Sequence, residues 1–336
     1  MSARARSASR SAAALALALC ALALAACGEK QEPSGPTPPQ RFDLALDFYV
    51  NPDHAGVYTA LDRGYFEQAG LDVVPRVPGD PSAPIKQVAA GQADVAISYE
   101  PEVFLARQQG LDVISVASLV DEPLTSLISL PDAGITEPAD LAGKTIATAG
   151  IPYQQDYLET ILTQAGLSLS DVNEVNVGFN LLPALLGGQA DAILGGFLNV
   201  EGVELERRGD DPSVVPVDQL GVPTYDELVV VADRSRVEDD PESIRLFLEA
   251  LARGTRDAVK DPQSATEVIL DHGQALDRAT TEAEINATLP LLAPGREGFG
   301  RMSPDEWERF AGWMADRGLI DGIPPMDEVL SNDLLP

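Results

Sequence analysis

Aromatic, amide and acidic residues follow short apolar segments at four places in this chain. Aromatic rings stack on flat ligands, and carboxylates or amides hydrogen-bond a ligand's polar edge. We therefore expect these side chains to bind a small polar ligand, and we assign none of them a catalytic or metal-binding role. The candidate binding residues are Tyr49, Asn51, His54, Ser98, Tyr99, Glu100, Tyr153, Phe197, Asn199, Glu201 and Tyr225.

An internal repeat predicts how these residues are positioned. Gly91-Gln92-Ala93-Asp94 recurs 97 residues later as Gly188-Gln189-Ala190-Asp191, and Gln68–Leu71 recurs 96 residues later as Gln164–Leu167. Two tetrapeptide matches at nearly one offset indicate two similar α/β lobes. In each lobe a helix is expected to end at Gly-Gln-Ala-Asp, and a buried strand begins there. The residues after that strand should face the space between the lobes.

Strand and helix patterns alternate along the chain, which predicts an α/β fold with two mixed, mostly parallel sheets. Strands are expected at residues 42–48, 71–77, 94–98, 113–117, 145–149, 172–177 and 191–194. Helices are expected at 55–68, 80–90, 101–109, from 154, and at 181–186, 241–259, 262–270, 280–291 and 304–317. Apolar segments 124–130 and 228–232 should cross between the lobes as a two-strand hinge. Ligands of open α/β sheets bind at the carboxyl ends of strands, so the candidate residues should converge on one cleft.

The expected domain order has five parts. Residues 1–26 form a signal peptide, 27–41 a proline-rich tether, 42–128 the first lobe and 129–228 the second lobe. Residues 229–336 return to the first lobe and place their helices at its back.

The N-terminal segment predicts where the protein is located. Arginines precede an apolar segment, and Leu24-Ala25-Ala26-Cys27 resembles a bacterial lipobox, in which the cysteine carries the lipid. We expect an extracytoplasmic body anchored to the cell membrane through Cys27; the alternative is a plain signal peptide with a chance cysteine.

Composition excludes several classes of function. Cys20 and Cys27 are the only cysteines, so the body has no disulfide, cysteine nucleophile or cysteine-based zinc site. The formal net charge of −30 repels nucleic acid, and its ordinary role is solubility.

The chain resembles a type II periplasmic binding protein, in the branch of nitrate, sulfonate, taurine and thiamine-pyrimidine proteins. Segments 51–58, 64–73 and 115–123 carry the resemblance, which covers about residues 42–313. It implies a monomeric receptor without a cofactor, which closes on a small heteroaromatic ligand and then docks to an ABC permease in the membrane.

The same branch contains enzymes that build the thiamine pyrimidine with pyridoxal phosphate. The resemblance implies that their lysine and histidine lie four residues apart, where this chain has Ser98 and Glu102. The enzymes also carry a cysteine-rich segment that this body lacks. We therefore expect a receptor rather than a pyridoxal-dependent synthase.

The resemblance assigns the ligand carboxylate to Glu201, four residues after an aromatic residue, which here is Phe197. The alternative is that Glu201 belongs to a solvated helix face, as most glutamates do. Tyr99 could stack on the ligand or be a core tyrosine. His54 could contact the ligand or serve the core or a helix cap. A tyrosine or tryptophan would fit the pattern of the branch at position 197. Because this chain has Phe197 there, its ligand could differ from the usual pyrimidine.

The expected ligand is a thiamine-precursor aminopyrimidine of the formyl-aminopyrimidine or hydroxymethylpyrimidine type. Alternatives within the branch are a riboflavin-type heterocycle or an anion such as a sulfonate, nitrate or taurine. An anion site should place arginine or lysine in the cleft, and the four loop ends contain neither.

Overall fold

The structure, a computed structural model, describes residues 38–292 and 298–336. The predicted signal peptide, the lipidation site Cys27 and residues 27–37 of the tether lie outside the described residues. Residues Pro39–Pro336 form a single unit by their internal contacts, so the predicted limits of the lobes stay predictions. In the part of the chain that is described, no helix combines the length and the apolar character needed to span a bilayer.

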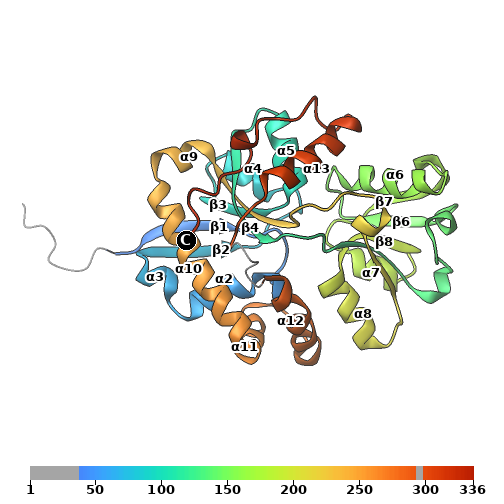
Figure 1. Cartoon of the computed structure of the whole chain (residues 1–336). Coiled ribbons are helices and arrows are strands. Elements are labelled where there is room, and N and C mark those ends of the chain that lie inside the picture. The colour runs from blue at the N-terminus through green and yellow to red at the C-terminus, as the bar shows by residue number, and fades with distance from the viewer. Residues whose placement is uncertain (1–37, 293–297) are drawn as a thin grey trace, which may run out of the picture. The chain divides into compact units, whose positions relative to one another are not determined.

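Within the described residues, ten strands form two sheets, in agreement with the predicted α/β class (Figure 1). The first sheet has the order β2-β1-β3-β10-β4, and β10 runs antiparallel to both of its neighbours. Its strands are β1 (Gln40–Ala45), β2 (Leu71–Arg76), β3 (Val95–Ser98), β4 (Val113–Val120) and β10 (Leu228–Asp233). We call this sheet and its covering helices the first lobe.

The second sheet repeats this order as β7-β6-β8-β5-β9, with β5 antiparallel to both of its neighbours. Its strands are β5 (Thr125–Ser129), β6 (Thr145–Thr148), β7 (Asn173–Asn176), β8 (Ala192–Phe197) and β9 (Ser213–Pro216). We call this sheet and its helices the second lobe. Strand β9 was not expected from the sequence.

The repeated motif does the same structural work in both lobes. Gly91 and Gly188 have φ values of 66° and 67°, a left-handed conformation that ends the preceding helix. Asp94 then accepts a hydrogen bond of 2.7 Å from the backbone N–H of Asp43. Asp191 accepts the equivalent bond of 2.8 Å from the N–H of Thr145. The motif therefore stops a helix and joins the start of its own strand to the neighbouring strand.

Short helices connect the strands of each lobe. The first lobe has α2 (Ala55–Asp62), α3 (Tyr65–Gln68), α4 (Pro84–Ala89) and α5 (Glu100–Gln108). The second has α6 (Gln154–Gln164), α7 (Leu181–Leu186), a π-helical turn (Leu198–Gly202) and α8 (Val203–Arg208). The single helix predicted over residues 55–68 is wrong, because Gly64 at φ 65° separates α2 from α3.

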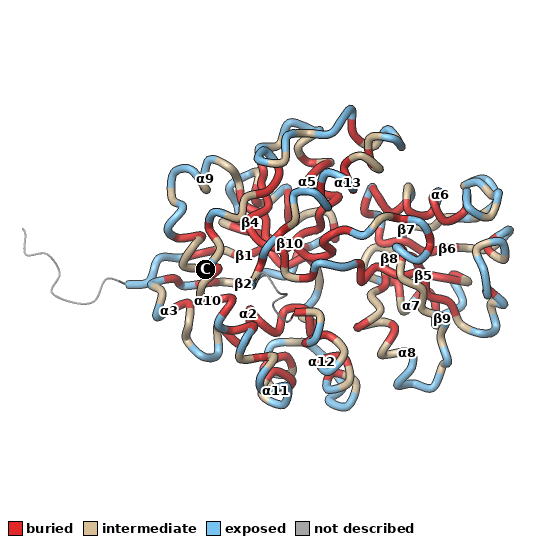
Figure 2. Tube along the Cα trace, in the orientation of Figure 1, coloured by how far each residue is buried: buried red, intermediate tan, exposed pale blue. Residues whose placement is uncertain are grey.

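The C-terminal part contributes α9 (Arg234–Asp239), α10 (Pro241–Lys260), α11 (Pro262–His272), α12 (Arg278–Leu292) and α13 (Pro304–Asp316). Helix α10 packs on α2, and Phe247 of α10 stacks between Phe42 and Phe66 in the core of the first lobe. Figure 2 shows that buried segments run through both sheets while the helices expose their outer faces.

The assignment of the C-terminal helices to the back of the first lobe stays a prediction, and two of these helices also contact the second lobe. Helix α12 packs against α8 and the π-helical turn of the second lobe as well as the loop after β1 (Figure 1). On α13, the ring of Trp313 lies 5.8 Å from that of Tyr157 on α6. Both helices therefore touch the two lobes at once.

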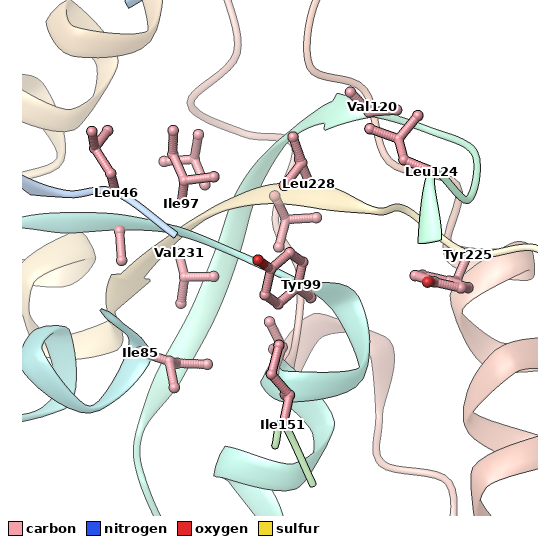
Figure 3. Packing of buried hydrophobic residues seen from close by; sticks show 14 of the residues in the cluster. Leu46, Ile85, Ile97, Tyr99, Val120, Leu124, Ile151, Tyr225, Leu228 and Val231 are labelled. Atoms are coloured by element: carbon pink, nitrogen blue, oxygen red, sulfur yellow. The ribbon is translucent and has the colours of Figure 1, made fainter. Parts of the chain in front are cut away.

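The two chain crossings between the sheets are tied together by a buried carboxylate. Oε2 of Glu227 accepts hydrogen bonds of 2.8 Å from the backbone N–H groups of Leu124 and Thr125, and one of 2.9 Å from the Tyr225 hydroxyl. Oε1 accepts a bond of 3.0 Å from the Thr125 hydroxyl. Leu124 and Tyr225 mark the two crossings in Figure 3, with Leu228 at the start of β10. Burial raises the pKa of Glu227 to about 7.

Candidate functional site

A cavity lies between the lobes, where β1, β3, β6 and β8 reach their carboxyl ends. Both lobes contribute side chains to it. It is lined by Asp47, Phe48, Asn51, Pro81, Tyr99, Thr125, Ala149, Ile151, Tyr153, Gln154, Leu181, Gly195, Phe197, Val200 and Glu201.

Asp47 is the buried acid on the first-lobe wall, with only 1% of its surface exposed. Its Oδ1 lies 2.8 Å from Nε2 of His54, and its Oδ2 accepts a hydrogen bond of 3.0 Å from the Tyr99 hydroxyl. The backbone N–H of Asn51 points at Nδ1 of His54 at 3.3 Å. An N–H can only donate, so Nδ1 is the acceptor, and the proton of a neutral His54 lies on Nε2, facing Asp47.

Glu201 is the acid on the second-lobe wall. Its Oε2 accepts a hydrogen bond of 2.7 Å from the backbone N–H of Phe197, four residues earlier. Phe197 and Glu201 therefore both line the cavity, although the segment is a π-helical turn rather than an α-helix. Burial raises the pKa of Glu201.

Aromatic rings form the walls between these two acids. Phe48 and Tyr99 come from the first lobe, and Tyr153 and Phe197 come from the second. The rings of Tyr99 and Tyr153 meet edge to face with centroids 6.2 Å apart across the lobes. Tyr99 and Ile151, which also line the cavity, extend toward each other in Figure 3. Such walls suit a flat aromatic ligand.

Gln154 adds an amide at the first residue of α6. Its Oε1 accepts a hydrogen bond of 2.9 Å from the backbone N–H of Ala149. Its Nε2 lies 2.3 Å from the place where a Cβ on Gly195 would sit, and Gly195 has φ 115°. Glycine is therefore required at position 195 to leave room for this amide.

The structure brings five of the eleven predicted site residues to the cavity: Asn51, Tyr99, Tyr153, Phe197 and Glu201. Their roles in binding stay predictions, but their position matches the expected convergence of four loop ends.

The other six predicted residues lie behind or beside the cavity lining. His54 supports Asp47, and Tyr225 donates to Glu227 at the hinge. The Ser98 hydroxyl donates to Glu102 at 2.7 Å. Glu100 accepts a bond of 2.7 Å from the N–H of Asp226.

Asn199 and Tyr49 act between the lobes. Asn199 donates to Asp53 and to Thr288 of α12. The ring of Tyr49, which is 54% exposed, lies 4.9 Å from that of Phe179 in the second lobe. Phe179 is also 4.8 Å from the ring of Phe48, so these three rings bridge the lobes beside the cavity.

Sequence reasoning missed Asp47, Phe48 and Gln154. Asp47 takes a polar position of the alternation close to the end of the first predicted strand, and a carboxylate at that point was the available signal. Gln154 opens the helix that follows a predicted strand of the second lobe. Phe48 falls within the predicted strand 42–48, whereas the strand ends at Ala45.

Several acids near the cavity are buried. Burial raises the pKa of Asp53 and of Glu102 to about 7. Burial also raises the pKa of Glu284 on α12 to about 8, and the nearby carboxylates of Glu204, Glu201 and Asp53 add to this shift. The surroundings of the cavity are therefore acidic.

Comparison with proteins of known sequence gives relatives of two kinds. The formylaminopyrimidine-binding protein of Halalkalibacterium halodurans is 35% identical over 277 residues, which are 81% of this chain and 84% of the relative. The 4-amino-5-hydroxymethyl-2-methylpyrimidine phosphate synthase of Aspergillus parasiticus is 30% identical over 242 residues, 69% of this chain and 70% of the relative. One relative carries the name of a binding protein and the other that of an enzyme.

Solved structures confirm the predicted fold of a type II periplasmic binding protein. The alkanesulfonate-binding protein SsuA of Xanthomonas axonopodis pv. citri matches with a TM-score of 0.69 and 15% identity, over 90% of this chain and 99% of that chain. The aliphatic sulphonate-binding protein SsuA of Escherichia coli matches with a TM-score of 0.68 and 14% identity, over 88% and 99%. At these identities the likeness shows the fold alone.

The family model described as NMT1/THI5 like matches residues 51–265, which include most of both sheets and the whole cavity lining except Asp47 and Phe48. Together with the 35% identity to the bacterial relative over most of both chains, this match shows that the chain belongs to the NMT1/THI5-like family.

Proposed function

We propose that this chain is the extracytoplasmic binding lipoprotein of an ABC importer, and that it captures a thiamine-precursor aminopyrimidine between its two lobes. The ligand is of the formyl-aminopyrimidine or hydroxymethylpyrimidine type. The name of the Halalkalibacterium halodurans relative supports this class of ligand. Closure of the lobes on the ligand would generate the form that docks to the permease.

The observation that carries the proposal is that Asp47 and Glu201 come from opposite lobes and line one cavity together with aromatic rings from both lobes. An aminopyrimidine is flat and carries N–H donors on its edge. Its faces suit the rings of Phe48 and Phe197, and its donors suit the two carboxylates.

The cavity lining argues against an anionic ligand. Among the described residues, it contains two carboxylates and no lysine or arginine. A sulfonate or nitrate would meet like charge without a cation to bind it, and so would the sulfonate group of taurine, which also carries an ammonium group. The structural likeness to sulfonate-binding proteins therefore extends to the fold and not to this site.

The Ser98–Glu102 pair supports a receptor over a synthase. The hydroxyl of Ser98 is bonded to Glu102, and both side chains are buried. The resemblance places the lysine and histidine of the enzymes at these positions. A serine and a buried acid cannot replace a lysine that forms a Schiff base.

Ligand identity is tested with a thermal-shift panel on the purified full chain. The panel contains aminopyrimidines, thiamine, riboflavin, taurine and nitrate. A ligand at 100 times its dissociation constant adds about 2.7 kcal/mol to the free energy of unfolding. We expect stabilisation by aminopyrimidines; stabilisation by taurine or nitrate alone would contradict the proposal.

The role of Glu201 is tested with Glu201→Gln. Removing the charge while keeping the shape should weaken aminopyrimidine binding by about 1.5–3 kcal/mol, the usual contribution of a hydrogen bond to a charged group. Glu206→Gln is the matched control, because Glu206 is exposed on α8 and outside the cavity lining. Equal affinity of Glu201→Gln and the unaltered chain would remove Glu201 from the site.

A further inference from the structure

Most hydrogen-bond donors that line the cavity are already used within the protein. The Tyr99 hydroxyl donates to Asp47 at 3.0 Å. The Thr125 hydroxyl donates to Glu227 at 3.0 Å, and Nδ2 of Asn51 donates to the carbonyl of Tyr49 at 3.2 Å. Carboxylates can accept several hydrogen bonds each, so the lining offers a ligand more acceptors than donors.

The charge of Asp47 is not cancelled by its partners. Tyr99 is a neutral donor. His54 accepts at Nδ1 from the Asn51 N–H and gives its Nε2 proton to Asp47, which is the pattern of a neutral imidazole. Asp47 therefore presents a carboxylate charge to the cavity.

Further acids lie around the two lining acids. Asp53 and Glu102 act electrostatically with Asp47, and Asp53, Glu204 and Glu284 act with Glu201. Burial raises the pKa of Asp53 and of Glu102 to about 7, so near neutral pH each is only partly ionised. The direct ionic partners for a cationic ligand are therefore the lining carboxyl groups, Asp47 on the first lobe and Glu201 on the second.

We propose that the cavity binds its heteroaromatic ligand as the cation protonated on a ring nitrogen, with the charge held between Asp47 and Glu201. This inference rests on the proposed function and adds the protonation state of the ligand. Aminopyrimidines are weak bases whose ring nitrogen accepts a proton in mildly acidic solution. An anionic partner in a poorly hydrated site raises the pKa of such a base and favours its charged form. When both lining acids are ionised before the ligand enters, the proton comes from solvent, so above the pKa of the free ligand binding takes up a proton from solution.

The test is isothermal titration calorimetry of the full chain with 4-amino-5-hydroxymethyl-2-methylpyrimidine. Titrations in buffers of different ionisation enthalpy measure the protons exchanged on binding. We expect about one proton taken up per ligand when the pH lies well above the pKa of the free ligand, and an affinity that falls about tenfold per pH unit there. The pyridine analogue, a stronger base already protonated at neutral pH, should bind without proton uptake. The benzene analogue, which lacks a ring nitrogen, should bind at least tenfold more weakly.

Asp47→Asn and Glu201→Gln each remove one charge, and each should lower the proton uptake and flatten the pH dependence. Glu206→Gln is the control and should keep both unchanged. If Asp47→Asn fails to fold, as judged by circular dichroism, Glu201→Gln supplies the same readout.

An affinity for the pyrimidine that is independent of pH, with no proton uptake, overturns the inference but leaves the proposed function standing. Equal binding of the benzene analogue overturns it as well. Failure of every aminopyrimidine to bind at any pH removes the proposed function itself.

Discussion

The side-chain amide of Asn199 donates a hydrogen bond of 2.7 Å to Oδ1 of Asp53, which joins the second lobe to the loop after β1 in the first. The same Nδ2 also donates to the hydroxyl of Thr288 on α12 at 2.8 Å. All three side chains are buried. Because Asp53 follows the cavity-lining segment of the first lobe, we expect this contact to couple the relative position of the lobes to the shape of the site.

Asn199→Ala should favour the open form. Loss of the two hydrogen bonds should destabilise the closed form by about 1 kcal/mol relative to the open form. This lowers the ligand affinity roughly fivefold. The interlobe distance can be measured with probes on two introduced cysteines, since the chain after Cys27 has none. Asn286→Ala is the control, because its amide bonds only to Glu282 in its own helix. An unchanged distance distribution in Asn199→Ala would contradict the coupling.

Phe179→Ala should speed ligand release. The ring of Phe179 packs against Phe48 and Tyr49 across the lobes, and such aromatic pairs are worth about 0.5–1.5 kcal/mol. Release of the bound ligand should therefore become roughly 2- to 10-fold faster, with little change in the association rate. Stopped-flow displacement measures both rates. Val77→Ala is a control for an exposed apolar side chain; if it accelerates release equally, the aromatic bridge is not the cause.

The free energy of unfolding should fall as the pH rises from about 4.5 to about 7. Glu227 has its pKa raised to about 7 by burial, so in this window the folded chain holds a proton that the unfolded chain has released. Proton binding by the folded form stabilises it at low pH, and that stabilisation is lost as the pH passes the folded pKa. Asp53, Glu102 and Asp226, whose pKa values burial also raises to about 7, act in the same direction.

Glu227→Gln isolates the hinge contribution. Glutamine can keep its oxygen at the position of Oε2 and donate from its amide to the Thr125 hydroxyl. Across this pH window, the free energy of unfolding of the variant should fall by about 1–3 kcal/mol less than that of the unaltered chain. Urea unfolding at each pH measures this difference. Glu206→Gln should leave the profile unchanged. A Glu227→Gln profile that matches the unaltered chain would show that Glu227 does not titrate in this range.

Gly254→Ala should destabilise the first lobe. A Cβ at this position of α10 would lie 2.3 Å from the carbonyl oxygen of Gly56 and 2.6 Å from Cβ of Ala60, both on α2. Relief of this clash requires the helices to separate, at a cost of about 1–3 kcal/mol. Gly312→Ala on α13 is the control, because its new Cβ would meet only Ile323, at 3.7 Å. We expect that variant to be neutral or slightly stabilised in thermal unfolding.

The architecture could be predicted from the sequence because it depends on local patterns. The repeated Gly-Gln-Ala-Asp motif ends a helix through a left-handed glycine and fixes a strand through its aspartate, using residues close to it in the chain or on the next strand. Strand alternation and the positions of Asn51, Tyr99 and Glu201 at strand ends follow from the same short-range rules. From these rules alone, and without knowing how the core packs, one can predict that the loop ends meet at one cleft.

Tertiary packing decided which side chains of each loop end turn into the cavity. Asp47 faces it because His54 and Tyr99 hold its carboxylate, while Asn199 turns to Asp53 and Thr288. Each of these orientations depends on a partner from another element of the fold. Thr288 on α12, for example, lies 89 residues beyond Asn199 in the sequence. Sequence periodicity carries no information on such partners, because a side-chain direction is fixed only when distant elements pack. The sequence alone therefore determined two lobes with a cleft, and the tertiary structure determined the acids and rings that line it.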